Sequence, residues 1–391
     1  MGGCTNIVEL MLHENQLIYL PPSIGWVKTI KKLTLGANAI HVLPRTVCKM
    51  YSLEILHFSH NDMAKLIPYF SNLPGLTELD LSHNKLVELP IQVGSLVNLT
   101  YLDMSNNLLE ILHPTVGFMS SLTHLDLSYN KLEAIPDAIF DITLLEYLAL
   151  DHNLISILQG SISALRQCKT LHLSHNMMRQ FPDSVGSLKN LGHLSIGFNQ
   201  YKTVPDVVTC LKNLKEMWIS EALSLSDEGF LPPWLNQCVS LRTLHIDDDD
   251  RRTPPPAVAE RGVDSILNYV RRINSALMER AINLSGLSLQ ECPYIPFRRI
   301  VSLDLSRNRL EEINDEITGL IHLTSLSLLS NRITEVTRNV IELRNLQVLI
   351  CARNKVNFFP DFVGRHMTCI KKLDLGHNKI MAIPSSGKIR R

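Results

Sequence analysis

The 391-residue chain lacks an excess of charge of either sign, because 38 Lys and Arg residues balance 38 Asp and Glu residues. This balance provides no global electrostatic attraction to nucleic acid or to an anionic membrane. The chain also lacks long apolar runs, so no segment is expected to span a bilayer. Its first residues, as written, lack the charged region and apolar stretch that form a secretory signal.

The eight cysteines are dispersed and include no C-x-x-C pair. This spacing argues against a disulfide framework and against a zinc site. Cys168 and Cys351 stand where equivalent segments carry leucine, so both are expected to be buried hydrophobic residues. The chain contains no G-x-x-x-x-G-K-[ST], G-x-S-x-G or H-E-x-x-H motif. We therefore predict no catalytic residue, no metal and no cofactor.

What the chain does contain is a 23-residue repeat that asparagine marks nine times in succession. Each asparagine closes a phrase L-x-x-L-x-L-x-x-N-x-L, of which residues 122–132 are a clear copy. A fixed period of this length is the signature of a leucine-rich repeat solenoid. The asparagines are Asn15, Asn38, Asn61, Asn84, Asn107, Asn130, Asn153, Asn176 and Asn199, and later repeats add Asn308, Asn331, Asn354 and Asn378.

The residue types follow from the physics of stacking. Leucines one, four and six of the phrase point inward, and positions three and five point outward from a strand. The asparagine amide can satisfy backbone groups where the chain turns out of that strand. The sequence therefore predicts an α/β solenoid. It is a curved leucine-rich repeat array with one long parallel sheet on its concave face, interrupted by a helical connector.

After Asn199 the leucine phrase continues for two more copies without its asparagine, and three consecutive prolines at 254–256 then mark a boundary. Apolar residues then recur at helical spacing, which predicts an amphipathic helix from about 261 to 280. We divide the chain into a first array at 1–249 with about 11 repeats, a connector at 250–283, and a second array at 284–391 with about 5 repeats. Leu284 is expected to open the second array, with Cys292 in an asparagine position.

Aromatic and imidazole side chains gather in the outward columns of the first array. Such amphipathic rings are favoured at the centres of protein interfaces. A single histidine in a phrase such as LDLSHNKL is also an ordinary feature of the repeat. The alternative interface is the convex side with the connector, where Arg271 and Arg272 would hold an acidic partner. The predicted partner-binding residues are Tyr101, His124, Tyr147, His172, His193, Phe198 and Trp218.

The opening MGGCTN suggests lipidation. Gly2 followed closely by Cys4 is the arrangement used for myristate plus palmitate, and two chains are needed for stable anchoring. Asn6 departs from the motif, which has Ser or Thr at that position. The chain is therefore expected to be cytoplasmic, or peripheral at the inner membrane face if Gly2 and Cys4 are acylated.

The phrase LDLSHNKLVELP at 79–90 resembles the intracellular Ras-associated class of leucine-rich repeat proteins, which includes plant Ras-group and Scribble-type proteins. The connector TPPPAVAERGVDSILNYVRR resembles the tail that often follows such arrays. The resemblance implies a cytoplasmic scaffold for signal transduction, with a small GTPase, kinase or phosphatase as partner. Two alternatives are the repeat region of a larger signalling enzyme, with a kinase or Roc-type GTPase domain, and a lipid-anchored adaptor.

Overall fold

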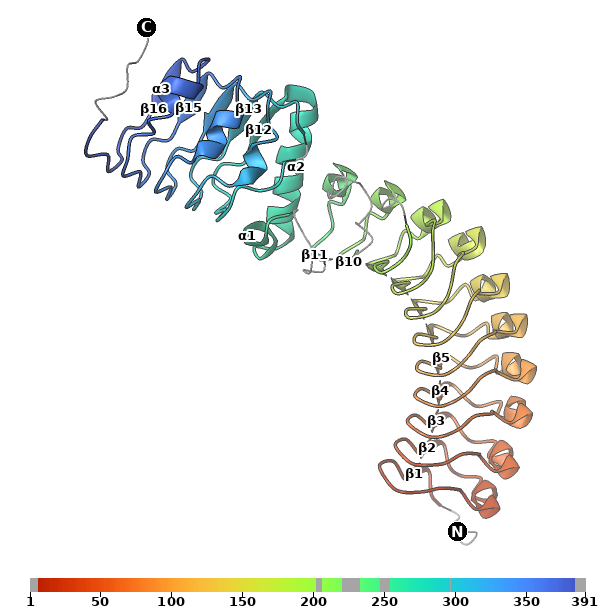
Figure 1. Cartoon of the computed structure of the whole chain (residues 1–391). Helices are drawn as coiled ribbons and strands as arrows, with labels where there is room; N and C mark the ends of the chain where they lie inside the picture. Colours follow the sequence, from red (N-terminus) through yellow and green to blue (C-terminus); the bar gives the residue numbers. More distant parts are fainter. Residues whose placement is uncertain (1–5, 202–205, 220–232, 247–253, 296, 384–391) are drawn as a thin grey trace. The chain divides into compact units, whose positions relative to one another are not determined.

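A computed structural model of the chain describes residues 6–201, 206–219, 233–246, 254–295 and 297–383. It divides into two compact units, each with one parallel sheet (Figure 1). The first unit comprises 1–225 with 238–247, and the second comprises 226–237 with 248–391. Gly2 and Cys4, the candidate lipidation sites, lie outside the described residues. No described helix is long and apolar enough to cross a membrane.

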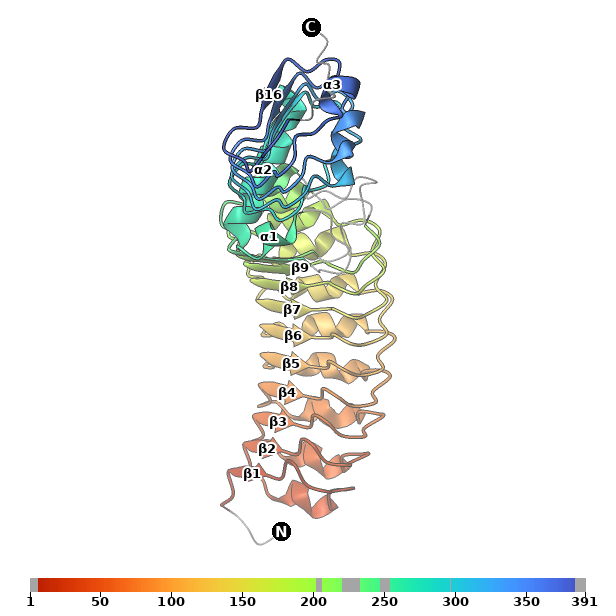
Figure 2. The ribbon, with the colours of Figure 1, turned by 60° about the vertical axis from the view of Figure 1, so that its left-hand side comes forward.

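The sheet of the first unit has eleven parallel strands, which follow one another in sequence order. Each is three residues long and centred on position four of the phrase, as in the pairing of Leu102 with Leu125. Figure 2 shows the strands labelled β1 to β9 lying one after another along the first unit. They are β1 (Glu9–Met11), β2 (Lys32–Thr34), β3 (Ile55–His57), β4 (Glu78–Asp80), β5 (Tyr101–Asp103), β6 (His124–Asp126), β7 (Tyr147–Ala149), β8 (Thr170–His172), β9 (His193–Ser195), β10 (Glu216–Trp218) and β11 (Thr243–His245).

Short 3-10 helices lie on the side of the first unit opposite its strands (Figure 1). Several begin directly after an extended proline, as η4 does after Pro90, because proline holds φ near the value that precedes the turn. Leucines between the two layers are buried, as Leu102 and Leu125 are at 0% exposure. The helices are η1 (Pro22–Trp26), η2 (Arg45–Lys49), η3 (Pro68–Asn72), η4 (Ile91–Ser95), η5 (Pro114–Phe118), η6 (Asp137–Asp141), η7 (Gly160–Ala164), η8 (Asp183–Ser187) and η9 (Asp206–Cys210), with η10 (Pro233–Gln237) grouped in the second unit.

The asparagines join each repeat to the one before it. Asn130 Nδ2 donates to the carbonyls of Met104 at 3.0 Å, Leu127 at 3.0 Å and Ser128 at 3.1 Å. Its Oδ1 accepts the backbone N–H of Leu109 at 3.0 Å. The same arrangement recurs at Asn84, Asn153 and the other internal asparagines. One buried side chain thus satisfies backbone groups of two neighbouring turns.

The second unit contains a five-stranded parallel sheet. Its helix α2 (Val263–Glu279) agrees closely in its bounds with the amphipathic helix expected from about 261 to 280. The elements are α1 (Pro256–Ala259), α2 (Val263–Glu279), β12 (Ala281–Asn283), β13 (Ser302–Asp304), η11 (Asp315–Ile317), β14 (Ser325–Ser327), η12 (Arg338–Glu342), β15 (Val348–Ile350), α3 (Val363–His366) and β16 (Lys372–Asp374).

The expected register at the start of the second array is wrong. Ile282 pairs with Leu303, so Leu284 is the sixth position of its repeat and not the first. Asn308 Oδ1 accepts the backbone N–H of Leu289 at 3.1 Å. In the first unit this hydrogen bond comes from the residue two positions after the preceding asparagine, as when Leu109, two residues after Asn107, donates to Asn130. The asparagine position is therefore Leu287, and Cys292 lies beyond it. The first strand, β12, also lies within the range assigned to the connector.

Helix α2 covers the start of the second unit's core. Its Tyr269 and Ile273 are 2% and 4% exposed and pack in one cluster with Ile282. Arg272 Nη1 donates to the Ser285 carbonyl at 2.7 Å. This hydrogen bond ties Arg272 to the end of β12, so the arginine contributes to the fold of this unit. Arg271, in contrast, is exposed.

Replacing Asn130 by alanine should lower the free energy of unfolding by about 1–3 kcal/mol, because buried backbone groups lose their partner. Asn98→Ala is the matched control, since Asn98 is exposed and donates only to the Pro74 carbonyl. We expect denaturant unfolding followed by circular dichroism to show a much smaller change for the control. Equal stability of the Asn130 variant and the wild-type chain would contradict the structural role.

Candidate protein-interaction surface

The concave face of the first unit carries a column of stacked rings on β5, β6 and β7. Tyr101 and His124 have ring centroids 4.3 Å apart, and His124 and Tyr147 are 4.1 Å apart, both nearly parallel. Parallel strand pairing aligns these three residues at position three. All three are half-buried. Burial raises the pKa of Tyr147 to about 12, so its hydroxyl remains protonated and available as a hydrogen-bond donor.

A second ring column runs along position eight of the repeats. Tyr129, His152, His175 and Phe198 stack with centroid separations of 4.0, 3.9 and 4.0 Å. Each of these residues has a positive φ between 51° and 53°. The left-handed backbone directs consecutive side chains to the same side of the sheet, because every repeat turns in the same way. His60 and His83 form a further stacked pair in this column.

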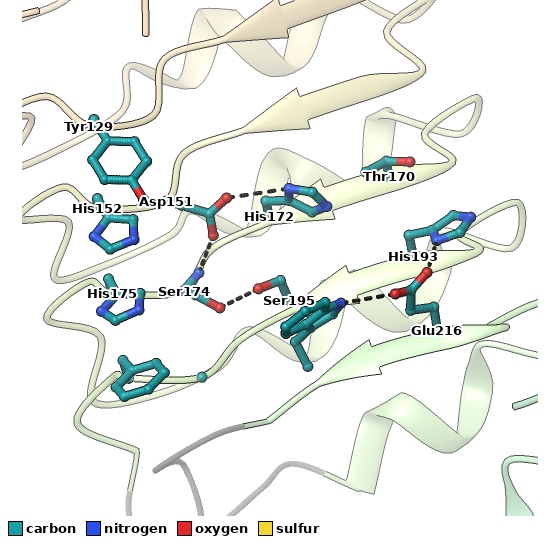
Figure 3. A pocket seen from close by; sticks show the side chains of 13 residues that line it. Tyr129, Asp151, His152, Thr170, His172, Ser174, His175, His193, Ser195 and Glu216 are labelled. Carbon is teal, nitrogen blue, oxygen red and sulfur yellow. Dashed lines mark hydrogen bonds and ion pairs between the residues drawn. The ribbon is translucent and has the colours of Figure 1, made fainter. Parts of the chain in front are cut away.

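A hollow of about 570 Å³ lies between ring side chains on β8–β10 and in the turns that follow β6–β9. Figure 3 shows Tyr129, His152 and His175 along one side of it, and His172 and His193 along the other. Its floor consists of small residues, Ser174, Ser195 and Gly197, all buried. The hollow has depth because these small residues, at position five or seven of their repeats, are surrounded by rings at positions three, five and eight of the neighbouring repeats.

Carboxylates hold the rings of this hollow in place. Glu216 accepts from Trp218 Nε1 at 3.1 Å and is within 2.9 Å of both His193 Nδ1 and His245 Nε2. The indole of Trp218 stacks on His245 at 3.6 Å. Glu216 has a lowered pKa, because these hydrogen bonds outweigh the opposing effect of burial. The carboxylate is therefore ionised at neutral pH and fixes three rings.

On the opposite wall, Asp151 lies 3.3 Å from His172 Nδ1 and accepts from Ser174 N at 2.7 Å. Side chains that are already held by such bonds lose little conformational entropy when a partner docks on them.

The seven predicted partner-binding residues all lie in the first unit, in two groups. Tyr101, His124 and Tyr147 form the first ring column. His172, His193, Phe198 and Trp218 line the hollow. An edge-to-face contact of 5.6 Å between Tyr147 and His172 joins the groups.

Sequence reasoning missed the carboxylates Asp151 and Glu216 as parts of this surface. It also left Tyr129, His152 and His175 out of the predicted set, although they stand at the same position of the repeat as the predicted Phe198. The recurrence of large rings at position eight was the signal that could have identified them.

The arrangement offers rings, carboxylates and hydroxyls that can bind a partner. Among the described residues, no group of three His, Cys, Asp or Glu side chains is placed to hold a metal ion. Burial raises the pKa of the Cys168 and Cys351 thiols to about 12. Both residues are 0% exposed, which agrees with their positions in place of leucine.

Comparison with known families identifies leucine-rich repeats in this chain. The Leucine rich repeat family model matches residues 28–86, 67–109, 97–155 and 120–178. All four matched segments lie in the first unit, and they include most strands of the candidate surface. Leucine-rich repeat domains are generally protein-interaction modules.

Curated relatives share only part of their length with the chain. An uncharacterized leucine-rich repeat-containing protein of Schizosaccharomyces pombe is 26% identical over 174 residues, which cover 41% of this chain and 28% of that protein. A leucine-rich repeat and calponin homology domain-containing protein of Drosophila melanogaster is 29% identical over 113 residues, covering 23% and 14%. The chain thus spans less than a third of either relative.

Solved structures establish the fold. The Leptospira interrogans leucine-rich repeat protein is 25% identical, with a TM-score of 0.52 and coverage of 96% of this chain and 91% of that one. The functional domain of InlJ from Listeria monocytogenes is 20% identical, with a TM-score of 0.54 and coverage of 95% and 68%. At such identities the likeness concerns the leucine-rich repeat architecture.

Acidification should destabilise the first unit through its ring columns. Burial lowers the pKa of His83, His124 and His152, and the charge of a stacked histidine adds to this effect at His83 and His152. Below their ordinary pKa of about 6.5, these histidines take up protons more readily when unfolded than when folded. The free energy of unfolding should therefore fall as the pH drops through this value.

Denaturant unfolding at a series of pH values measures this slope. We expect His124→Gln to reduce it, whereas His366→Gln, on α3 of the second unit, leaves the response of the first unit unchanged. An unaltered slope in the His124 variant would refute the assignment to this ring column.

Proposed function

We propose that the chain is a non-catalytic scaffold that binds a folded protein partner on the concave face of its first unit. The observation that carries this proposal is the first ring column together with the neighbouring hollow on β8–β10, which the second ring column lines. Contiguous exposed apolar patches mark interaction sites, and Trp218, at 43% exposure, lies beside the other rings of this surface. Aromatic anchors beside a hollow are typical of the energetic centre of an interface.

The rigidity of the surface supports the same proposal. Parallel pairing in fixed register determines the spacing of the rings, and stacking holds their planes nearly parallel. Glu216 and Asp151 fix further side chains by hydrogen bonds. A partner would therefore meet a preformed surface, so that little binding free energy is lost in ordering it.

The cellular setting that we propose is intracellular signal transduction, in the cytoplasm, with a small GTPase, kinase or phosphatase as partner. Support comes from the resemblance of the repeat phrase to the Ras-associated class and from cysteines that are free and mostly buried in the described residues. The alternatives are a larger signalling enzyme and an acylated adaptor. Flanking coding sequence would reveal the former, and mass spectrometry of the native N-terminus the latter.

Affinity purification with the full chain as bait, followed by binding measurements on the purified partner, tests the proposal. Tyr147→Ala combined with Trp218→Ala should weaken binding by more than about thirtyfold, because truncating interface anchors commonly costs more than about 2 kcal/mol. Calorimetry or surface plasmon resonance provides the dissociation constants.

Tyr51→Ala combined with Trp26→Ala is the matched control. It removes the same two residue types from exposed positions next to η2 and in η1, away from the concave face. A loss of affinity in this control pair, with none in the concave pair, would place the partner elsewhere and overturn the proposal. Arg271→Glu tests the connector as the competing site.

A further inference from the structure

Three carboxylates lie side by side on the concave face without a cationic partner. Asp80, Asp103 and Asp126 are direct register neighbours on β4, β5 and β6, so the strand spacing places them about 4.8 Å apart. Each Oδ1 accepts the backbone N–H of a serine two residues later, at 3.0, 2.8 and 2.9 Å respectively. In the described residues no hydrogen bond uses Oδ2, so these oxygens remain available for a further donor. We call these three residues the acidic row.

Some carboxylates elsewhere in the first unit have a lysine partner. Lysines lie 2.7 Å from Glu54, 2.5 Å from Asp62 and 2.7 Å from Glu146. From β3 to β9, in contrast, positions three, five, seven and eight of the repeats contain no Lys or Arg. The chain as a whole is neutral, but this face carries an uncompensated negative charge.

The acidic row lies beside the first ring column, and this second feature distinguishes it from a solvated acidic patch. Tyr101, His124 and Tyr147 occupy position three, two residues before position five on the same face of the sheet. Long cationic side chains pack their aliphatic stems on apolar surface while the charged head reaches a polar group. Burial and the neighbouring Asp126 and Asp80 raise the pKa of Asp103, an effect that a bound cation would relieve.

We propose that the concave face takes a basic, extended segment of the protein partner, whose arginines lie over the acidic row and whose neighbouring apolar side chain enters the hollow. This inference rests on the proposed function and specifies the chemistry of its partner. Arginine is preferred to lysine, because a planar guanidinium spans adjacent carboxylates and stacks against rings. A nucleic acid or an anionic membrane is disfavoured here, because the face would repel either one.

The geometry also fixes the length of the segment. The acidic row and the hollow together extend over β4–β10, which corresponds to about 30 Å across seven strands. An extended chain of about ten residues spans this distance. The probe is therefore a fluorescein-labelled peptide of about ten residues with alternating Arg and Gly, compared with its Lys–Gly and Glu–Gly counterparts. Fluorescence anisotropy with the full chain, at low and high salt, measures binding.

We expect the Arg–Gly peptide to bind more tightly than the Lys–Gly peptide, and the Glu–Gly peptide not to bind. Asp103→Asn combined with Asp126→Asn should weaken the Arg–Gly peptide by at least about tenfold. Asparagine retains the acceptor for the serine N–H groups, so the fold should persist, which circular dichroism verifies. Glu110→Gln combined with Glu133→Gln is the control, because it removes the same charge from exposed sites in the same two repeats.

Three results of the peptide experiment would overturn the inference. They are absence of Arg–Gly binding to the wild-type chain, unchanged binding in the Asp103 and Asp126 variant, and an equal loss in the Glu110 and Glu133 control. A purified partner that requires Tyr147 and Trp218 but is indifferent to the acidic row would also overturn it, while the proposed function would stand. Failure of the Tyr147 and Trp218 test itself would count against the proposed function.

Discussion

The first unit depends on the hydrogen bonds that each buried asparagine makes to the turn before it. Strands of three residues cannot form a stable sheet alone, and each leucine face is buried only by its neighbours. An amide such as that of Asn130 donates to carbonyls of its own turn and of the preceding turn, and accepts a backbone N–H in return. Regular stacking follows, because any other spacing would leave buried polar groups without partners.

The ring columns are a consequence of this regularity. When every repeat turns in the same way, residues at one position of successive repeats lie one strand spacing apart, close to the contact distance of stacked rings. Tyr101, His124 and Tyr147 therefore stack without any specific contact that selects them. The same reasoning places Asp80, Asp103 and Asp126 in a row, where their charges add. Residues at the same position of successive repeats therefore form a line of side chains on the surface.

Sequence patterns predicted the leucine-rich repeat fold and its inward leucines, because the interval between asparagines directly reports the stacking. The register of the first repeat in the second unit was mispredicted. The apolar residues at 282–289 fit the repeat phrase in two alignments. In the observed alignment the first position of the repeat is Glu279, the last residue of α2, so no leucine marks the start of this repeat. The role of Glu216 was missed because its partners His193 and His245 lie on other strands. Such contacts depend on side-chain directions that spacing alone does not determine.

The central claim is that the concave face of the first unit meets the partner. Hydroxyl-radical footprinting with mass spectrometry, on the full chain with and without the purified partner, tests it most directly. The account predicts that Tyr101, Tyr147 and Trp218 lose reactivity in the complex, while Trp26 and Tyr51 remain as reactive as in the free chain. Protection of Trp26 and Tyr51, with unchanged reactivity of the concave rings, would contradict it.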